Sequence, residues 1–345
     1  MSLKKISGLA LAVLTVWLAP HSYAESDFYG RAQISVDLLD DGVDSGANLS
    51  SNGSRIGFRT STELAPNLQG RLQIEQELRY DNGTVDNNTF ASRDTYVEME
   101  SGFGKLRMGY FNTPLKNIRG EVDFFGDQVG DARNLTRLDQ APYSQDFDSR
   151  FRNGIQYSTP EFGAFTLTLH HSTNNTEDSN PPDDAQTANS LALIYRAGDL
   201  YIAGGYETHE ARNDSDAVRI AAKYKLDALT LIGLFQTANI ENMPESEDVD
   251  VLGFGASYAW TAQTLFKGHV YSLSADSDEQ DARMLALGLD HQMGKQFWLQ
   301  FVYAGTNNDE FATYRVSAGG HGDKVTPAPG EQAMGLSAGL RYDFD

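Results

Sequence analysis

Alternation of apolar and polar residues is the feature that most restricts how this chain can fold. From Asp27 onward the chain divides into segments of about ten residues in which every second side chain is apolar. In the first segment the apolar set is Ala32, Ile34, Val36 and Leu38, and the polar set is Arg31, Gln33, Ser35 and Asp37. Successive side chains of a β-strand point to opposite faces of the sheet, so each segment is predicted to be a strand with one apolar and one polar face.

The segments and their connections predict an antiparallel sheet of about 16 strands. The last segment, 334–344, alternates as cleanly as the first, so the two ends of the chain could pair and close the sheet. Between them the expected strands are 53–64, 69–80, 91–100, 104–113, 149–160, 162–173, 187–197, 199–210, 216–226, 228–239, 249–260, 263–275, 282–293 and 296–305. Short turns alternate with long polar loops, which are expected at 39–52, 81–90, 174–186, 240–248 and 306–332. This arrangement of turns and loops is typical of a transmembrane β-barrel.

The polar faces distinguish a membrane barrel from a soluble β-sandwich. Charged residues recur on the polar faces of single strands: Arg71, Glu75, Glu77 and Arg79 on one, and Arg219, Lys223 and Lys225 on another. Charged side chains cannot fill a dry core without partners, whereas they can line a water-filled interior. We therefore expect an all-β, transmembrane antiparallel barrel whose apolar faces point outward, the inverse of a sandwich.

The N-terminus has the features of an export signal. Lys4 and Lys5 precede the apolar run 6–19, and small residues at Ser22 and Ala24 suit cleavage. We predict that residues 1–24 are a signal peptide and that residues 25–345 form the barrel. The apolar run is too short to span a bilayer, and no later segment offers the roughly 20 apolar residues of a transmembrane helix. Together with the absence of cysteine, export fits an envelope protein of a Gram-negative bacterium better than a secreted domain held by disulfides.

Composition and motifs argue against several other classes. The chain has 48 acidic and 27 basic residues, for a net charge of −21, so it should repel phosphate backbones and nucleic acid is not an expected partner. No phosphate-binding glycine loop is present, and the acidic stretches 245–250 and 276–279 lack EF-hand spacing, so neither a cofactor nor a metal is expected. An enzyme is not expected either, because at most one of the adjacent His170 and His171 can enter the lumen and no catalytic motif accompanies them.

The longest interruption of the alternation is the segment 110–148. It is about three times as long as a normal connection, and a compact domain seldom carries such a loop unless the loop has a function. It combines acidic and aromatic residues: Glu121, Asp123, Phe124, Phe125, Asp127, Asp131 and Asp139. We interpret this segment as a loop folded into the barrel. The alternative is an excursion over the surface.

Several stretches of the chain carry a family resemblance. They are DFYGRAQISVDL, SNGSRIGFRTSTEL, QGRLQIEQEL, SRDTYVEMESGFGKLRMGYFNTPLKNIRG and FRNGIQYSTPEFGAFTL. With these stretches, over essentially the whole mature chain, the sequence resembles the Gram-negative general porins, which are trimeric barrels of about 16 strands. The resemblance implies a homotrimer among outer-membrane lipids and lipopolysaccharide. It also implies passive diffusion of small hydrophilic solutes and ions across the outer membrane.

The resemblance further implies a constriction, because the third extracellular loop of the family folds inward and corresponds to 110–148. Its basic wall would be Arg31, Arg55, Arg93 and Arg150, and its acidic side would be Glu121, Asp123 and Asp127. Opposed charges would place a transverse field across the water-filled path, which admits polar solutes and resists apolar ones. Asp131 or Asp139 could take one of the acidic places. The arginines could instead form salt bridges that only stiffen the barrel.

The ionic preference of such a pore depends on which charges dominate. The net charge alone predicts a preference for cations, whereas inward arginines predict a preference for anions. Lumen charges act at a few ångströms, while loop charges are screened within about 8 Å in physiological salt. We expect the arginines to prevail and the pore to be weakly ion-selective.

Two further functions remain open. Phe124 and Phe125 could form a path for sugar rings in an oligosaccharide-selective porin, or they could anchor the loop to the barrel wall. The long acidic loops could instead serve an adhesion or structural barrel. None of these functions requires a bound cofactor.

The segment 91–100 fits the alternation least well. If Arg93 points inward, Asp94, Glu98 and Glu100 fall on the outward, apolar side. Carboxylates do not face lipid hydrocarbon without cost. Either this strand faces a partner subunit or its assigned register is wrong.

Overall fold

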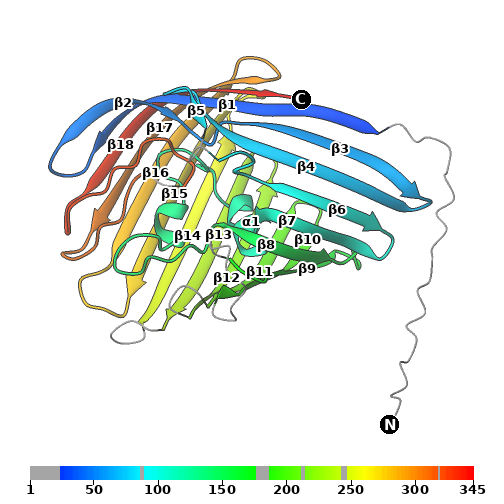
Figure 1. Cartoon of the computed structure of the whole chain (residues 1–345). Helices are drawn as coiled ribbons and strands as arrows, with labels where there is room; N and C mark the ends of the chain where they lie inside the picture. Colours follow the sequence, from blue (N-terminus) through cyan, green and yellow to red (C-terminus); the bar gives the residue numbers. More distant parts are fainter. Residues whose placement is uncertain (1–23, 86–88, 176–185, 211–213, 242–246, 318) are drawn as a thin grey trace, which may run out of the picture.

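The computed structural model describes residues 24–85, 89–175, 186–210, 214–241, 247–317 and 319–345. The predicted signal peptide lies outside the described residues except for Ala24, and so do most of the loops expected at 174–186 and 240–248. The described chain forms one 18-stranded antiparallel sheet that closes on itself, since β1 pairs with β18 (Figure 1). Both ends of the chain are thus paired strands, as predicted.

The strands follow one another around the barrel. They are β1 (Glu25–Asp40), β2 (Ser45–Ser51), β3 (Arg55–Ala65), β4 (Leu68–Arg79), β5 (Thr84–Val85), β6 (Thr95–Ser101), β7 (Gly104–Asn112), β8 (Arg150–Ser158), β9 (Phe165–Ser172), β10 (Ala188–Ala197), β11 (Leu200–His209), β12 (Ser215–Leu226), β13 (Leu229–Ile240), β14 (Glu247–Ala259), β15 (Thr264–Ala275), β16 (Ala282–Gln292), β17 (Phe297–Asn308) and β18 (Ala333–Phe344).

Two of these strands are extensions of others, so the barrel itself has 16 strands, as predicted. β2 and β3 both pair with β1 and are separated only by residues 52–54. β5 pairs with the end of β4. The prediction of an unpaired loop at 39–52 was therefore wrong: β1 extends to Asp40, and β2 supplies hydrogen-bond partners for its backbone.

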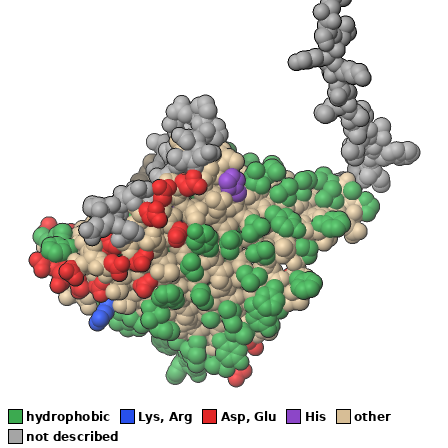
Figure 2. All heavy atoms as spheres, turned by 90° about the horizontal axis from the view of Figure 1, so that it is seen from below, with side chains coloured by type: hydrophobic (Ala, Val, Ile, Leu, Met, Phe, Trp, Pro, Cys, Tyr) green, Lys and Arg blue, Asp and Glu red, His purple; other side chains and the backbone are tan. Residues whose placement is uncertain are grey.

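The outer face of the barrel is apolar, as the alternation predicted. On β1, Val36 and Leu38 are 56% and 54% exposed, whereas the intervening Asp37 is fully buried. Similar apolar positions recur around the strands, and Figure 2 shows hydrophobic side chains spread over the outer surface, with acidic side chains gathered toward one end. This distribution matches a barrel surrounded by lipid with its loops in water.

The register expected for 91–100 was wrong. β6 begins only at Thr95, after residues of irregular backbone that include Ala91 at φ 62°. Arg93 and Glu98 therefore both reach the interior, where Glu98 accepts from Arg71 at 2.7 Å and pairs with Arg107 at 2.6 Å. Val97 and Met99 point outward instead. Of the two explanations offered for the acidic residues of 91–100, the wrong register therefore holds, and no partner subunit is needed to cover them.

The segment between β7 and β8, called the third loop below, folds into the barrel as predicted (Figure 1). It contains α1 (Pro114–Glu121), which contacts β10, β11 and β12, and α2 (Arg133–Thr136), which contacts β15. Thr113 caps α1 by accepting from the Lys116 backbone N–H, and proline at the first position suits a helix start. Within the described residues, no helix is long and apolar enough to cross a membrane.

The third loop creates a hydrophobic core inside the barrel. Leu115 and Ile118 of α1 are fully buried against the wall, and a Cβ at Gly205 of β11 would lie 2.6 Å from Ile118 Cδ1. Inward positions of the covering strands are correspondingly apolar, as at Ile232 and Leu234. The expectation that inward faces are polar therefore fails at such positions, while Arg219 and Gln236 on the same covered strands remain polar because they hydrogen-bond to each other and to the third loop.

Candidate pore constriction

The four predicted arginines lie on one stretch of the inner wall. Arg31 of β1 and Arg55 of β3 are direct neighbours across the strand pair. Arg93 follows next around the wall, since its backbone N–H donates to Glu75 on β4. Arg150 begins β8. We call Arg31, Arg55, Arg93 and Arg150 the arginine belt.

Every member of the arginine belt has a carboxylate partner. The shortest contacts are Arg31–Asp343 at 2.7 Å, Arg55–Glu75 at 3.5 Å, Arg93–Glu75 and Arg93–Glu77 at 2.8 Å, and Arg150–Asp94 at 2.6 Å. Charge therefore alternates around the wall. Such pairs hold the guanidinium groups in place, and arginine keeps its charge at any working pH.

The three predicted acidic residues do not form one row. Glu121 pairs with Lys223 at 2.5 Å and with Arg196 at 3.0 Å, on the wall behind α1. The Asp123 side chain is fully buried within the loop, where it accepts from Arg119 at 2.9 Å and from the Phe125 backbone N–H at 2.9 Å. Only Asp127 lies near the arginine belt, so the structure does not bring Glu121 and Asp123 opposite it.

Asp127 is the charged tip of the third loop. Its carboxylate pairs with Arg133 at 2.5 Å and lies against Gly53, at the break between β2 and β3. Burial alone would raise the pKa of Asp127, but Arg133, Arg93 and Arg55 together lower it below its usual range. Asp127 therefore stays ionised and supplies a fixed negative charge beside the belt.

Asp123 has a structural role instead. Burial, together with the neighbouring Asp131, raises the pKa of Asp123 to about 7. Its carboxylate also accepts from the backbone N–H of Ala132, so it ties the turn after α1 to the start of α2. Asp131 is likewise buried and is bound by Arg133. Asp139, the other candidate from the sequence, pairs with Arg137 at 3.5 Å.

Lys116 of α1 was missed by the sequence analysis. Its side chain is 9% exposed, and among the described residues none accepts a hydrogen bond from its Nζ. Burial lowers the pKa of Lys116 well below its usual range, and the nearby Arg150, Arg133 and Arg119 lower it further. The Thr-Pro cap of α1 was the available signal, because it places Lys116 within the first turn of an inward helix.

Buried contacts fix the third loop to the wall. Asp148 accepts from Arg219 Nη1 at 2.7 Å and from Nη2 at 3.0 Å, and all these side chains are fully buried. Phe125 is fully buried, with Lys267 Nζ 4.7 Å from its ring centroid and the His269 ring at 4.6 Å. Phe124 is partly buried and packs against the same cores. These positions favour the wall-anchor interpretation of the two phenylalanines.

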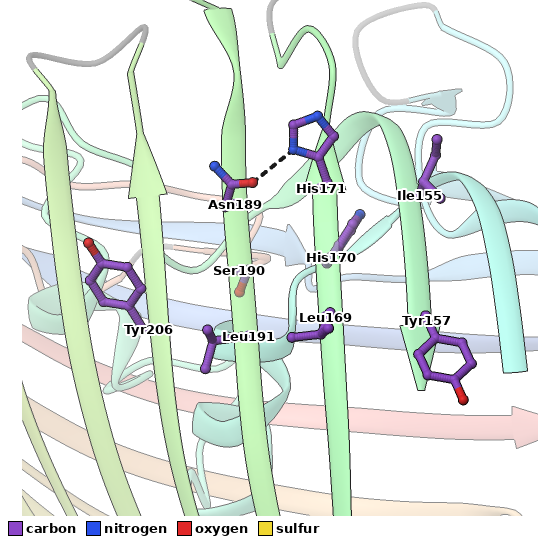
Figure 3. Close-up of a pocket in the computed structure, with 9 residues that line it drawn as sticks. All are labelled: Ile155, Tyr157, Leu169, His170, His171, Asn189, Ser190, Leu191 and Tyr206. Carbon is purple, nitrogen blue, oxygen red and sulfur yellow. Dashed lines mark hydrogen bonds between the residues drawn. The ribbon is translucent and has the colours of Figure 1, made fainter. Parts of the chain in front are cut away.

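The adjacent histidines point to opposite sides of β9, as predicted (Figure 3). His170 is buried and stacks on Phe111 with ring centroids 4.5 Å apart. His171 lies on the outer face, where its Nδ1 is 2.8 Å from Asn189 Oδ1. The described residues contain no cluster of three or more histidine, cysteine, aspartate or glutamate side chains that could hold a metal.

A 16-stranded membrane barrel narrowed from within by a charged loop is a pore-forming protein. The family model for Gram-negative porins matches residues 9–310, and the chain belongs to this family. It is an outer-membrane channel, as the sequence resemblance indicated.

Individual relatives and structures agree with this assignment. Outer membrane porin protein 32 of Delftia acidovorans is 23% identical over 99% of this chain and 100% of that protein. Chitoporin of Vibrio furnissii is 32% identical over 48% of this chain and 46% of that protein. The anion-selective porin from Comamonas acidovorans shares the fold with a TM-score of 0.82, at 21% identity over 93% of this chain and 100% of that one. The trimer form of OmpT from Vibrio cholerae shares the fold with a TM-score of 0.70. It is 17% identical and covers 94% of this chain and 100% of that one.

Proposed function

We propose that this outer-membrane channel allows passive diffusion of small hydrophilic solutes and ions, with a weak preference for anions. The arginine belt at the constriction is the observation that carries the proposal. Residues 1–24 would direct export and be removed. No energy coupling enters the proposal, because diffusion down a gradient requires only a water-filled path of suitable size and charge.

Shared carboxylates support the preference for anions. Asp343 pairs with both Arg31 and Arg341, and Glu98 pairs with both Arg71 and Arg107. Each of these carboxylates is shared by two guanidinium groups, whereas Arg93 pairs with both Glu75 and Glu77. Lys116 adds a further cationic group when protonated. These charges act on a permeating ion at short range, whereas charges on the outer loops are screened.

Arg55→Ala tests the role of the belt. We expect the reversal potential in a salt gradient to shift toward cation preference, because the variant removes a fixed positive charge and leaves Glu75 less compensated. Arg59→Ala is the matched control: it lies on the same strand in an exposed pair with Asp27, with both side chains more than two-fifths exposed. Equal shifts in the two variants, or no shift in either, would contradict the proposal.

A homotrimer is the proposed assembly. A trimeric structure is known for OmpT, which shares the fold. The apolar outer face, which includes Phe28, Val36 and Leu38, can pack against other copies as well as against lipid. Light scattering in a mild detergent should give the mass of three chains, and a stable monomer would contradict this assembly.

Selective passage of oligosaccharides is the second candidate, favoured by the similarity of half the chain to chitoporin. Phe125 is fully buried, which removes it from a sliding path for sugar rings. We therefore expect added chito-oligosaccharides to leave the current unblocked. Saturable block would instead establish a sugar site.

A further inference from the structure

The segment between β17 and β18 also enters the barrel. We call residues 309–332 the last loop. Tyr314, Val316 and Ser317 are at most 2% exposed, and the Tyr314 backbone N–H donates to Asn308 Oδ1 at the end of β17 at 3.0 Å. The carbonyl oxygen of Val316 accepts from the Gly130 backbone N–H at 2.8 Å and from Asn134 Nδ2 at 3.0 Å. The last loop is therefore bonded directly to the third loop inside the barrel.

Glycines of the last loop touch the charged tip of the constriction. A Cβ at Gly320 would lie 2.1 Å from Asp127 Oδ1, and one at Gly319 would lie 2.3 Å from Arg133 Cζ. The bare backbone thus packs against the Asp127–Arg133 ion pair. A shift of this backbone removes one of the contacts that hold the two side chains.

His321 attaches this backbone to the barrel. Its Nδ1 lies 2.6 Å from the carbonyl oxygen of Asp323, and its Nε2 lies 3.1 Å from Asp37 Oδ2 on β1. Both the His321 and the Asp37 side chains are fully buried. A carbonyl oxygen only accepts hydrogen bonds, so Nδ1 donates to Asp323, while Nε2 faces the Asp37 carboxylate.

Polar contacts around this pair complete the attachment. Asp37 also accepts from Ser35 Oγ at 3.0 Å, and the Gly322 backbone N–H donates to Asn52 Oδ1 at 3.0 Å. Asn48 Nδ2 on β2 donates to the Asp323 carboxylate at 2.9 Å. β1, β2 and the break before β3 therefore hold one short stretch of the last loop. Among these contacts, the one between His321 and Asp37 joins two fully buried side chains.

We propose that His321 is a positioning residue for permeation: paired with Asp37, it holds the last loop as a second wall of the constriction and fixes Asp127 and Arg133. The size limit and the ionic preference of the pore then depend on a residue that does not touch the solute. The inference rests on the chain being a channel, but it does not depend on the sign of the preference proposed above.

Removal of the contact between His321 and Asp37 tests this role. His321→Ala and Asp37→Asn should raise single-channel conductance and admit larger neutral polymers, because the last loop is released from the constriction. His321→Gln should restore part of the wild-type size limit, since its amide still donates one hydrogen bond to Asp37. His171→Ala, on the outer face, is the control and should behave as wild type. A wild-type size limit in folded His321→Ala, checked by heat-modifiable migration, would overturn the proposal.

A second variant leaves the contact between His321 and Asp37 intact. Gly320→Ala adds a methyl group against Asp127, so we expect a shifted reversal potential with a nearly unchanged polymer limit. No shift in Gly320→Ala would remove the link between the last loop and Asp127. The results also separate the two proposals: a wild-type pore without anion preference that still widens in His321→Ala refutes the proposed selectivity and leaves the role of His321 standing.

Discussion

At the scale of residues, the constriction combines charges that differ in how firmly they hold their protons. The guanidinium groups of Arg31, Arg55 and Arg93 are each paired with a carboxylate, which favours their charged form. Lys116 is different, because its ammonium lies among other cations with no acceptor among the described residues. The sequence motifs predicted that these arginines face the lumen, because the position of a residue on a strand determines whether its side chain points inward or outward. They did not locate the acidic partners, because the direction of a loop side chain depends on contacts such as Asp123 with Arg119.

Lys116→Gln should weaken the preference for anions and remove its pH dependence. In the wild type the pKa of Lys116 lies well below its usual range, so its charge, and with it part of the anion preference, should be lost as pH rises through that lowered pKa. A pH titration of the reversal potential would show this step below the ordinary lysine pKa of about 10.4. Lys105→Gln, which removes an exposed lysine paired with Glu100, is the control. This variant should retain the pH-dependent step in the reversal potential. A pH-dependent step in the reversal potential of Lys116→Gln as large as that of the wild type would show that Lys116 is not the titrating group.

At the scale of elements, the alternation of apolar and polar residues predicted the strands. It did not predict which inward faces the loops inside the barrel would cover. Expected and observed strand bounds agree closely from β7 to β18, because lipid selects an apolar residue at every second position. The pattern failed at β2 and before β6, where pairing with a long neighbour or an irregular backbone sets the register. It also failed on the strands behind the third loop, since the loop covers apolar inward residues such as Ile232 as well as polar ones such as Arg219.

Asp148→Asn tests how the third loop is anchored. The change leaves the fully buried Arg219 without its anionic partner, and breaking such a pair costs about 3–5 kcal/mol. Urea unfolding of the detergent-solubilised barrel should report this loss, whereas Asp27→Asn in an exposed pair should cost only about 0–1 kcal/mol. Similar losses in the two variants would show that the buried pair is not the anchor.

The same anchor predicts how the barrel responds to acid. Burial would raise the pKa of Asp148, but Arg219 and Arg119 outweigh it and lower the pKa from 3.8 to about 2. The stabilisation is fully present above the unfolded value of 3.8 and is lost as pH falls through about 2. Protease accessibility of the third loop should therefore remain low at pH 3.8 and rise only in stronger acid.

At the scale of the whole molecule, the fold separates three environments. The outer face of the barrel is apolar, the wall from β1 to β8 carries paired charges, and the opposite wall is buried beneath the third loop. The last loop contacts the third loop inside the barrel. Under the proposed function, the arginine belt on the uncovered wall governs permeation although the overall charge of the chain is strongly negative.

Single-channel recording of the refolded mature chain in a salt gradient is the most direct measurement of this account. We expect steady ohmic steps that arrive in threes, with a reversal potential displaced modestly toward the anion side. The steps would report three pores per assembly, and the displacement would report the arginine belt. Strong cation selectivity that Arg31→Ala and Arg55→Ala leave unchanged would contradict the central claim, because the charges at the constriction would then not determine which ions pass.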